Sequence, residues 1–264
     1  DNVQKHKKVK KYSKQRNIPF IPSIEISPMW AHFNIYPIPM GYDKLTNRGT
    51  AKEIFESARK LDNSIIQINH PWTSYGYYYS KKNNKIPGEY TENYDVVEME
   101  EGKNKTMEKM YKHWNNGEEK FIVASTDIHD VRSKVTGTPR TFAQVNGKLT
   151  VDKYSKAIKE GNSFLTYGPL VYPEKKFGET YKAENDLFRL SFEAESVHGL
   201  KEIHVINEGE IVKSRILSSK YVELKDIKNK SFDFFFNVPE KTWYSLIIID
   251  KKGNYLYSNP IWVK

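Results

Sequence analysis

The sequence contains no cysteine among its 264 residues, which excludes disulfide bonds and thiolate metal sites. Any bound metal ion must therefore be held by histidine, aspartate and glutamate, a donor set that favours hard or borderline ions. No apolar run approaches the roughly 18 residues of a membrane-spanning helix, and no signal peptide is visible, so we expect no membrane span. Glycine-rich phosphate loops, dinucleotide fingerprints and G-x-S-x-G elbows are also absent, so we expect no organic cofactor.

Aromatic residues make up 14% of the chain, far too many for a disordered protein. The net charge of +9 could attract anionic substrates or polyanions, although a lysine-rich proteome would give the same excess. The densest basic run, residues 5–16, also contains Val9 and Tyr12. We interpret this run as the solvated face of a helix, and we do not expect nucleic acid as a partner because the aromatic residues do not interleave as in a recognition motif.

Strands and helices are expected to alternate over residues 1–175. Helical periods or polar faces predict helices, and short apolar runs predict strands. The expected helices cover residues 3–15, 50–61, 105–114 and 150–159, and the expected strands cover residues 20–26, 64–69, 94–99 and 121–124. Thr50 and Glu53 are spaced as a capping box. This alternation indicates an α/β layered or barrel domain, with its site at the carboxyl ends of the strands.

The composition changes near residue 175, and residues 176–264 form the second expected domain. Short alternating segments separated by turn residues predict an antiparallel β-sandwich with an Ig-like architecture. The expected strands cover residues 187–194, 201–206, 210–216, 231–238, 243–249 and 261–263. His198 and His204 lie in this part, and we interpret both as structural.

Asp127 and His129 follow the apolar segment 121–124, where that strand should end. Residues two apart on an extended segment point to the same side, so these two side chains can converge on one ion while Ile128 turns into the core. The alternative is that Asp127 caps the next segment and His129 is a surface histidine.

Three further candidates lie near the ends of the earlier strands. Glu25 lies near the end of the first strand, His32 follows it, and His70 ends the strand 64–69 directly before a proline. Each has a structural alternative, since Glu25 could pair with a lysine and His32 could form a hydrogen bond within a half-buried strand. The tyrosine-rich segment 72–79 is expected to be a loop that either lines a cleft or packs on the surface.

Together these five residues offer three imidazoles and two carboxylates, a set suited to zinc, manganese or iron and sufficient to bridge two ions. Paired cations can lower the pKa of bound water to around 7 and neutralise charge that develops on a phosphoryl or carbonyl oxygen. Arg140 could clamp the same oxygen, or it could be a structural salt-bridge partner. We therefore expect hydrolytic chemistry with Asp127 and Arg140 as catalytic residues.

Several short motifs, in this order and spacing, resemble the PHP-domain metallohydrolases, and within them the CehA/McbA family. They span about residues 20 to 170 and are Ile24-Glu25, Ala31-His32, Asn69-His70-Pro71, Ser125-Thr-Asp-Ile-His129, Gly137-Thr-Pro-Arg-Thr141 and Ser163-Phe-Leu-Thr-Tyr-Gly-Pro169. The terminal Ser258-Asn-Pro-Ile261 is similar to the end of the β domain that often follows in that family.

The resemblance implies a distorted (β/α) barrel with two or three divalent metal ions that acts on phosphoesters or on carboxyl or carbamate esters. It implies that Glu25 bridges metals, that His32 and His70 ligate one of them, and that Asp127 and His129 complete the cluster. The H-x-H and Thr-Asp-His motifs with which such families open are absent from this sequence. Either they belong to an upstream segment, which we expect because the chain opens on a helix, or the site holds fewer metals.

The sequence therefore predicts a divalent-metal-dependent hydrolase of small-molecule phosphoesters or related esters, with a metal-bound hydroxide as the nucleophile. The alternative is a non-catalytic cell-envelope or glycan-binding protein on a degenerate PHP barrel, which the absent H-x-H supports. A trailing β-sandwich and the lack of cysteine suit an exported or cell-envelope bacterial protein, and a cytoplasmic one is the other option.

Overall fold

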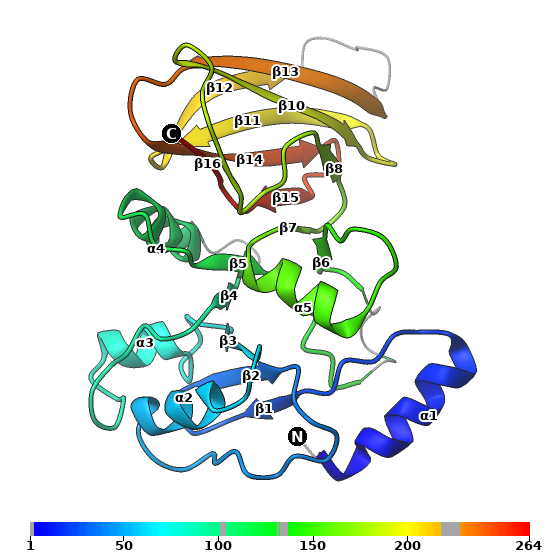
Figure 1. The fold of residues 1–264 in the computed structure, drawn as a ribbon, viewed down its shortest axis with the longest axis vertical. Coiled ribbons are helices and arrows are strands. Elements are labelled where there is room, and N and C mark those ends of the chain that lie inside the picture. Colours follow the sequence, from blue (N-terminus) through cyan, green and yellow to red (C-terminus); the bar gives the residue numbers. More distant parts are fainter. Residues whose placement is uncertain (1–2, 101–103, 131, 133–136, 218–227) are drawn as a thin grey trace. The chain divides into compact units, whose positions relative to one another are not determined.

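The computed structural model describes residues 3–100, 104–130, 132, 137–217 and 228–264. The fold is mixed α/β, with most of its regular structure in several β-sheets (Figure 1). The chain divides into two compact units, Asp1–Thr106 with Val145–Lys159 and Met107–Gln144 with Glu160–Lys264. The domain boundary expected near residue 175 stays a prediction. No helix in the described ranges has the length and apolar character needed to cross a membrane.

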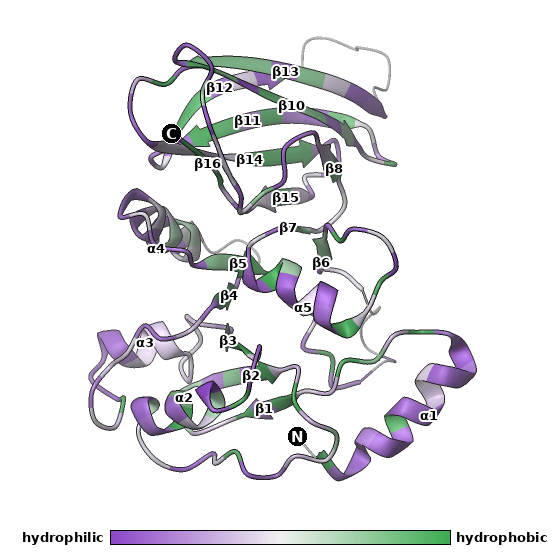
Figure 2. Cartoon of the chain, viewed as in Figure 1, coloured by the Kyte–Doolittle hydropathy of each residue, from purple (hydrophilic) through white to green (hydrophobic). Residues whose placement is uncertain are grey.

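Within its described residues, the first unit contains short strands and five helical segments. Its elements are η1 Val3–Lys5, α1 His6–Arg16, β1 Ile24–Ile26, β2 His32–Tyr36, α2 Ala51–Arg59, β3 Ile65–Asn69, α3 Tyr77–Lys82, β4 Val96–Glu98 and α5 Val151–Lys159. Strands β1, β2 and β3 pair antiparallel in that order, and β4 pairs parallel with β3. Helix α1 is largely hydrophilic and its lysines are exposed, as expected for a solvated helical face (Figure 2).

Helix α2 confirms the expected capping box. The Thr50 hydroxyl accepts a hydrogen bond from the backbone N–H of Glu53 at 3.3 Å, and the Glu53 carboxylate accepts one from the backbone N–H of Thr50 at 2.7 Å. These bonds satisfy donors that the first helical turn leaves without partners. The apolar face of α2 buries Phe55, whose ring contacts that of Phe33 on β2 with 5.0 Å between centroids.

Strand β2 separates an apolar face of the sheet from a polar one. Phe33 and Ile35 are fully buried, whereas the alternate residues His32, Asn34 and Tyr36 are half-buried. Side chains alternate between the two faces of a strand, so the three polar residues share one face. The face opposite α2 is therefore the polar one.

The tyrosine-rich segment differs from its expected form as a loop, because helix α3 begins at Tyr77. Tyr77 and Tyr78 are buried, and the Tyr77 ring contacts those of Phe33 and Phe55. Tyr77 and Tyr78 therefore belong to the core of the unit, whereas Tyr75 of the same segment is 42% exposed.

The second unit is built mainly from β-strands. Helix α4, Asn104–Asn115, has most of its residues in this unit. The strands of the unit are β5 Phe121–Val123, β6 Arg140–Ala143, β7 Ser163–Thr166, β8 Leu170–Pro173, β9 Thr180–Tyr181, β10 Leu187–Glu195, β11 Leu200–Asn207, β12 Glu210–Ile216, β13 Asn229–Asn237, β14 Thr242–Asp250, β15 Tyr255–Ser258 and β16 Ile261–Val263. One sheet has the order β13-β10-β8. The other has the order β12-β11-β14-β15-β7-β6, with β16 paired to β14 and β9 paired to β16.

The two sheets share one hydrophobic core, to which each contributes every second residue of its strands. Strands β10 and β13 supply seven buried hydrophobic residues, Phe188, Leu190, Phe192, Ala194, Phe232, Phe234 and Phe236, and the other sheet supplies residues such as Ile203, Val205, Leu246 and Ile248. Figure 2 shows hydrophobic residues along strands β10, β11 and β14. The alternating pattern of the sequence thus corresponds to two sheets packed face to face.

Candidate metal centre

Strand register brings Glu25, His32 and His70 together on the polar face of the first unit. Glu25 on β1 pairs with Asn34 on β2, and His32 at the start of β2 pairs with Asn69 at the end of β3. Because β2 and β3 run antiparallel, the start of one strand meets the end of the other. His70 directly follows Asn69 and so comes next to His32.

The donor atoms of these three residues are close enough to bind one ion. The Nε2 atom of His70 lies 2.9 Å from Nδ1 of His32, which in turn lies 3.5 Å from Oε1 of Glu25. One ligand atom from each residue can be chosen so that all lie within 4.8 Å of one another. Two imidazole nitrogens and one carboxylate oxygen form a common catalytic zinc donor set, which leaves a coordination position open for water or substrate.

A chain of hydrogen bonds orients the Glu25 carboxylate. The hydroxyl of Tyr36 donates to Gln67, the amide of Gln67 donates to Asn69, and the amide of Asn69 donates to Oε1 of Glu25, each at 2.9 Å. His32 is the main cause that lowers the pKa of Glu25 to about 2, and Asn69 adds to this effect while partial burial opposes it. Glu25 is therefore held as an ionised carboxylate, the form that binds a metal cation.

The backbone around His70 is held in a tight turn. His70 has a φ of +28°, unusual for a residue with a side chain, and Pro71 follows it. A Cβ atom at Gly76 would lie 2.4 Å from the Pro71 carbonyl and 2.5 Å from the His70 oxygen. The turn therefore closes only with glycine at position 76.

Glu98, at the end of β4, supports His70 from the other side. Its Oε2 atom accepts a hydrogen bond from the His70 backbone N–H at 2.7 Å and lies 3.7 Å from Nδ1 of the His70 ring. Glu98 is buried, with 6% exposure. A carboxylate close to the second nitrogen of a metal-binding histidine is the usual outer partner that fixes the orientation of the ring.

The aromatic ring of Tyr75 adjoins both histidines. Its centroid lies 5.0 Å from that of His32 and 5.3 Å from that of His70. Tyr75 is the exposed tyrosine of the 72–79 segment, and its role in lining a cleft stays a prediction.

Asp127 and His129 belong to the second unit, in the segment that follows β5. Both side chains are exposed, at 53% and 85%, and Nδ1 of His129 lies 3.7 Å from Oδ1 of Asp127. The same ring nitrogen lies 3.0 Å from the Asp127 backbone oxygen. The two residues adjoin each other, but Asp127 has a φ of +42° and is not in the extended conformation expected for it. Their binding of one ion, and their participation in one cluster with Glu25, His32 and His70, stay predictions.

Arg140, the first residue of β6, is also in the second unit. Its Nη1 donates a hydrogen bond to the Gly137 carbonyl at 2.9 Å, and its guanidinium lies 5.5 Å from the centre of the Phe142 ring. These contacts are local to the turn and strand. The expected catalytic role of Arg140 stays a prediction.

Sequence reasoning missed the supporting roles of Gln67, Asn69 and Glu98. Gln67 and Asn69 are two apart on β3 and so face the same side as His32, a spacing that could have pointed to them once β3 was expected. Glu98 was visible as a carboxylate near the end of the strand 94–99. Its contact with His70 depends on the parallel pairing of β3 with β4.

No family model matches this sequence, and no curated protein matches it either. Among solved structures, 14 chains match. One is an engineered protein, at 9% identity over 37% of this chain and 20% of that one, with a TM-score of 0.25. Another is the sulfur carrier protein SoxY from Chlorobium limicola f thiosulfatophilum, at 10% identity over 37% of this chain and 79% of that one, with a TM-score of 0.24.

A third match is a Niemann-Pick type C2 protein from the Japanese carpenter ant, at 10% identity over 38% of this chain and 91% of that one, with a TM-score of 0.22. This chain therefore spans only a fifth of the length of the engineered protein, and each alignment covers less than two fifths of this chain. At these TM-scores the likenesses assign neither a fold family nor a function.

Proposed function

We propose that this protein is a divalent-metal-dependent hydrolase of phosphoester or related ester bonds. The observation that supports it is the convergence of Glu25, His32 and His70, whose donor atoms lie within 4.8 Å of one another on one face of a sheet. Three such donors with an open position are typical of hydrolytic metal sites. Zinc, manganese and iron are the ions that suit this donor set.

The residues of the chain have separate tasks in this proposal. A bound ion would supply Lewis acidity toward the scissile group and toward water. His32 and His70 would hold the ion with neutral nitrogens, and Glu25 would balance its charge. Asn69 fixes the Glu25 carboxylate, and Glu98 fixes the backbone of His70. The ordered outer partners reduce the reorganisation needed when an ion binds.

The full proposal includes the second unit. Asp127 and His129 would ligate a further ion of the two or three that a PHP-type barrel holds, and Arg140 would bind the charged oxygen of the substrate. The order of the motifs along the sequence supports this assignment. Arginine suits the task because its planar guanidinium can donate two parallel hydrogen bonds to one oxyanionic group.

The test begins with elemental analysis of the protein after incubation with zinc, manganese or iron(II) and removal of loosely bound ions. We expect at least one equivalent per chain, and hydrolysis of a phosphoester or carboxyl ester from a chromogenic panel. His70→Ala should lose both the metal and the activity, since it removes a donor. Asp127→Ala should lose activity if the second unit contributes to the site.

The matched control is His204→Ala. His204 lies on β11 and contacts Ser214 and Glu202, so its removal should change neither metal content nor hydrolysis. Metal below about a tenth of an equivalent in the wild type would contradict the hydrolase. That result would favour the alternative of a non-catalytic binding protein.

A further inference from the structure

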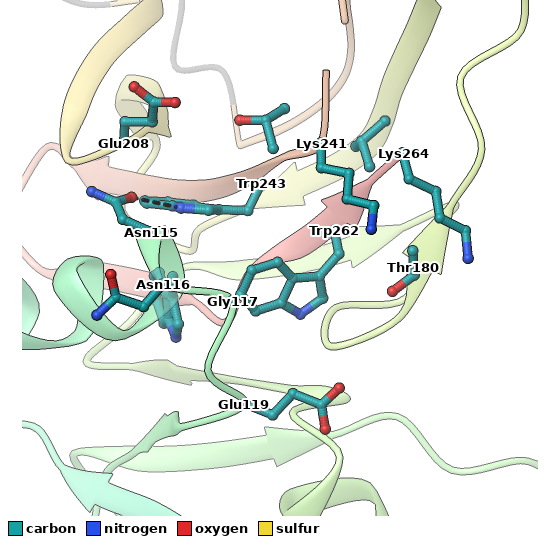
Figure 3. A pocket seen from close by; sticks show the side chains of 13 residues that line it. Asn115, Asn116, Gly117, Glu119, Thr180, Glu208, Lys241, Trp243, Trp262 and Lys264 are labelled. Atoms are coloured by element: carbon teal, nitrogen blue, oxygen red, sulfur yellow. Dashed lines mark hydrogen bonds between the residues drawn. The ribbon is translucent and has the colours of Figure 1, made fainter. Parts of the chain in front are cut away.

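The second unit contains a pocket of about 720 Å³ that is built from aromatic, amide and charged side chains (Figure 3). This volume lies in the range of pockets that bind small molecules. Residues of the second unit alone line it, and Glu25, His32 and His70 are not among them. Its ligand is therefore a question separate from that of the metal centre.

Three adjacent strands form one wall of the pocket. Strand β16 pairs antiparallel with β14, so that Trp262 lies opposite Trp243, and it pairs parallel with β9, so that Trp262 also lies opposite Thr180. Residues directly opposite on neighbouring strands project from the same face of a sheet. An indole ring at the centre is thus flanked by a second indole on one side and a hydroxyl group on the other.

The two tryptophans of this wall have different environments. Trp243 is buried, its ring stacks on that of Tyr111 with 5.5 Å between centroids, and its Nε1 donates a hydrogen bond to Oδ1 of Asn115 at 2.9 Å. Trp262 is only half-buried, and its Nε1 has no hydrogen-bond partner in the described part of the chain. The Trp243 ring is therefore held in place by its partners, whereas Trp262 offers apolar ring surface to a ligand.

The end of helix α4 supplies a polar rim. The N–H of Gly117 bonds to the Trp114 carbonyl at 3.0 Å, and the N–H of Glu118 bonds to the His113 carbonyl at 2.9 Å. This is a Schellman ending, and Gly117 has the φ of +72° that it requires. The turn leaves Asn116 exposed at the edge of the pocket, next to Asn115.

Charges of both signs surround the pocket. Lys241 and Lys264 extend in the same direction beside Trp262 in Figure 3, and Glu119 and Glu208 also contribute to the lining. None of the four side chains forms an ion pair within the described ranges, and all are exposed. These four side chains are two cations and two carboxylates, so together they offer many hydrogen-bonding groups without a net charge.

We propose that this pocket binds a pyranose ring of a neutral oligosaccharide, with Trp262 as the stacking platform. A pyranose has a face of C–H groups that packs on an aromatic ring and an equator of hydroxyl groups that both donate and accept hydrogen bonds. The exposed amide of Asn116, the hydroxyl of Thr180 and the charged side chains match that equator. A purely apolar ligand would leave these polar groups desolvated without partners, which is costly.

The experiment is a titration of the whole protein with chitotriose, cellotriose, maltotriose and mannotriose. Saturation-transfer NMR and isothermal titration calorimetry measure the binding. Each sugar is titrated to about 10 mM, so that binding is still detected when the dissociation constant is as weak as about 1 mM. We expect saturable binding of at least one sugar. Trp262→Ala should weaken that binding about tenfold or more, since the stacking surface is lost.

A second variant and a control keep the outcome clear. Asn116→Ala removes an exposed rim amide whose 3.4 Å side-chain hydrogen bond, from Nδ2 to Glu118, is also exposed, so it should weaken binding several-fold without affecting folding. Phe235→Ala removes a 53% exposed aromatic ring of β13, outside the pocket, and should leave binding unchanged. The inference is wrong if no sugar binds, or if Trp262→Ala and Asn116→Ala both bind as the wild type does.

Discussion

The side-chain amide of Asn69 donates a hydrogen bond to the Glu25 carboxylate at 2.9 Å, from a strand 44 residues further along the chain. Asn69 itself accepts a hydrogen bond from Gln67, which accepts one from Tyr36. Each member of this series fixes the next, and the series ends at a candidate metal ligand. The polar face of the sheet therefore orients Glu25 before any ion binds.

Asn69→Ala should lower the affinity of the first unit for zinc about 10- to 100-fold, the usual effect of removing an outer partner of a metal ligand. The substitution leaves all three donors in place, so metal should still bind at high concentration. Competition with a coloured zinc chelator measures the affinity. Asn83→Ala, which removes an exposed amide at the end of α3, is the control and should bind as the wild type does.

Gly76→Ala should destabilise the first unit by about 1–3 kcal/mol, as expected for an added methyl group without space. Its Cβ would lie 2.4 Å from backbone atoms of Pro71, which cannot move aside as a flexible side chain could. Because the same turn carries His70, zinc affinity should fall as well. Urea unfolding measures the stability, and Ser74→Ala in the same loop should have little effect.

Periodicity and capping signals were sufficient for the longer elements. The apolar period of residues 50–61 and the Thr50–Glu53 pair predicted α2, and the structure confirms both. Alternation over residues 231–238 similarly predicted β13, in which Phe232, Phe234 and Phe236 are buried. These signals are local, since one segment contains the whole pattern.

Elements that depend on distant partners were not predictable. Strands β6 and β9 have only four and two residues, too few to show a period, and they exist because β7 and β16 lie beside them. The candidate metal centre likewise combines residues that local sequence signals indicate with contacts that depend on distant partners. The sequence indicated His32 and His70 as candidate ligands, but their 2.9 Å contact depends on antiparallel register between β2 and β3, which no local pattern records.

The protein should lose stability in alkali as Tyr257 is forced to ionise. Burial raises the pKa of Tyr257 to about 12, whereas the same phenol in an unfolded chain titrates near 10. The folded state therefore holds its proton more tightly, and the free energy of unfolding falls as the pH rises from about 10 to about 12. Tyr257→Phe keeps the ring but cannot ionise.

Urea unfolding of the wild type and Tyr257→Phe at a series of pH values measures this effect. The variant should show a shallower decline between about pH 10 and 12, and similar stability at pH 8. Parallel declines would mean that the Tyr257 phenol titrates alike in the folded and unfolded states. Tyr12→Phe is the control, because that ring is 44% exposed and belongs to the first unit.

Asn259→Ala should destabilise the second unit by about 3 kcal/mol, because it leaves several buried backbone groups without partners. Asn259 is fully buried. Its Oδ1 accepts a hydrogen bond from the Ile122 N–H at 2.7 Å, and its Nδ2 donates to the Ser163 carbonyl at 3.1 Å. Asn259 thus joins β5 to β7 through one side chain.

Urea unfolding, monitored by tryptophan fluorescence, measures the free energy of unfolding. Asn237→Ala, at the exposed end of β13, is the control. A loss below about 1 kcal/mol would show that water replaces the amide at little cost. Asn259→Ala should also accelerate amide exchange at Ile122, since its N–H loses its acceptor. Because β5 leads directly into the segment of Asp127 and His129, the same variant reveals whether hydrolysis depends on a firmly held β5.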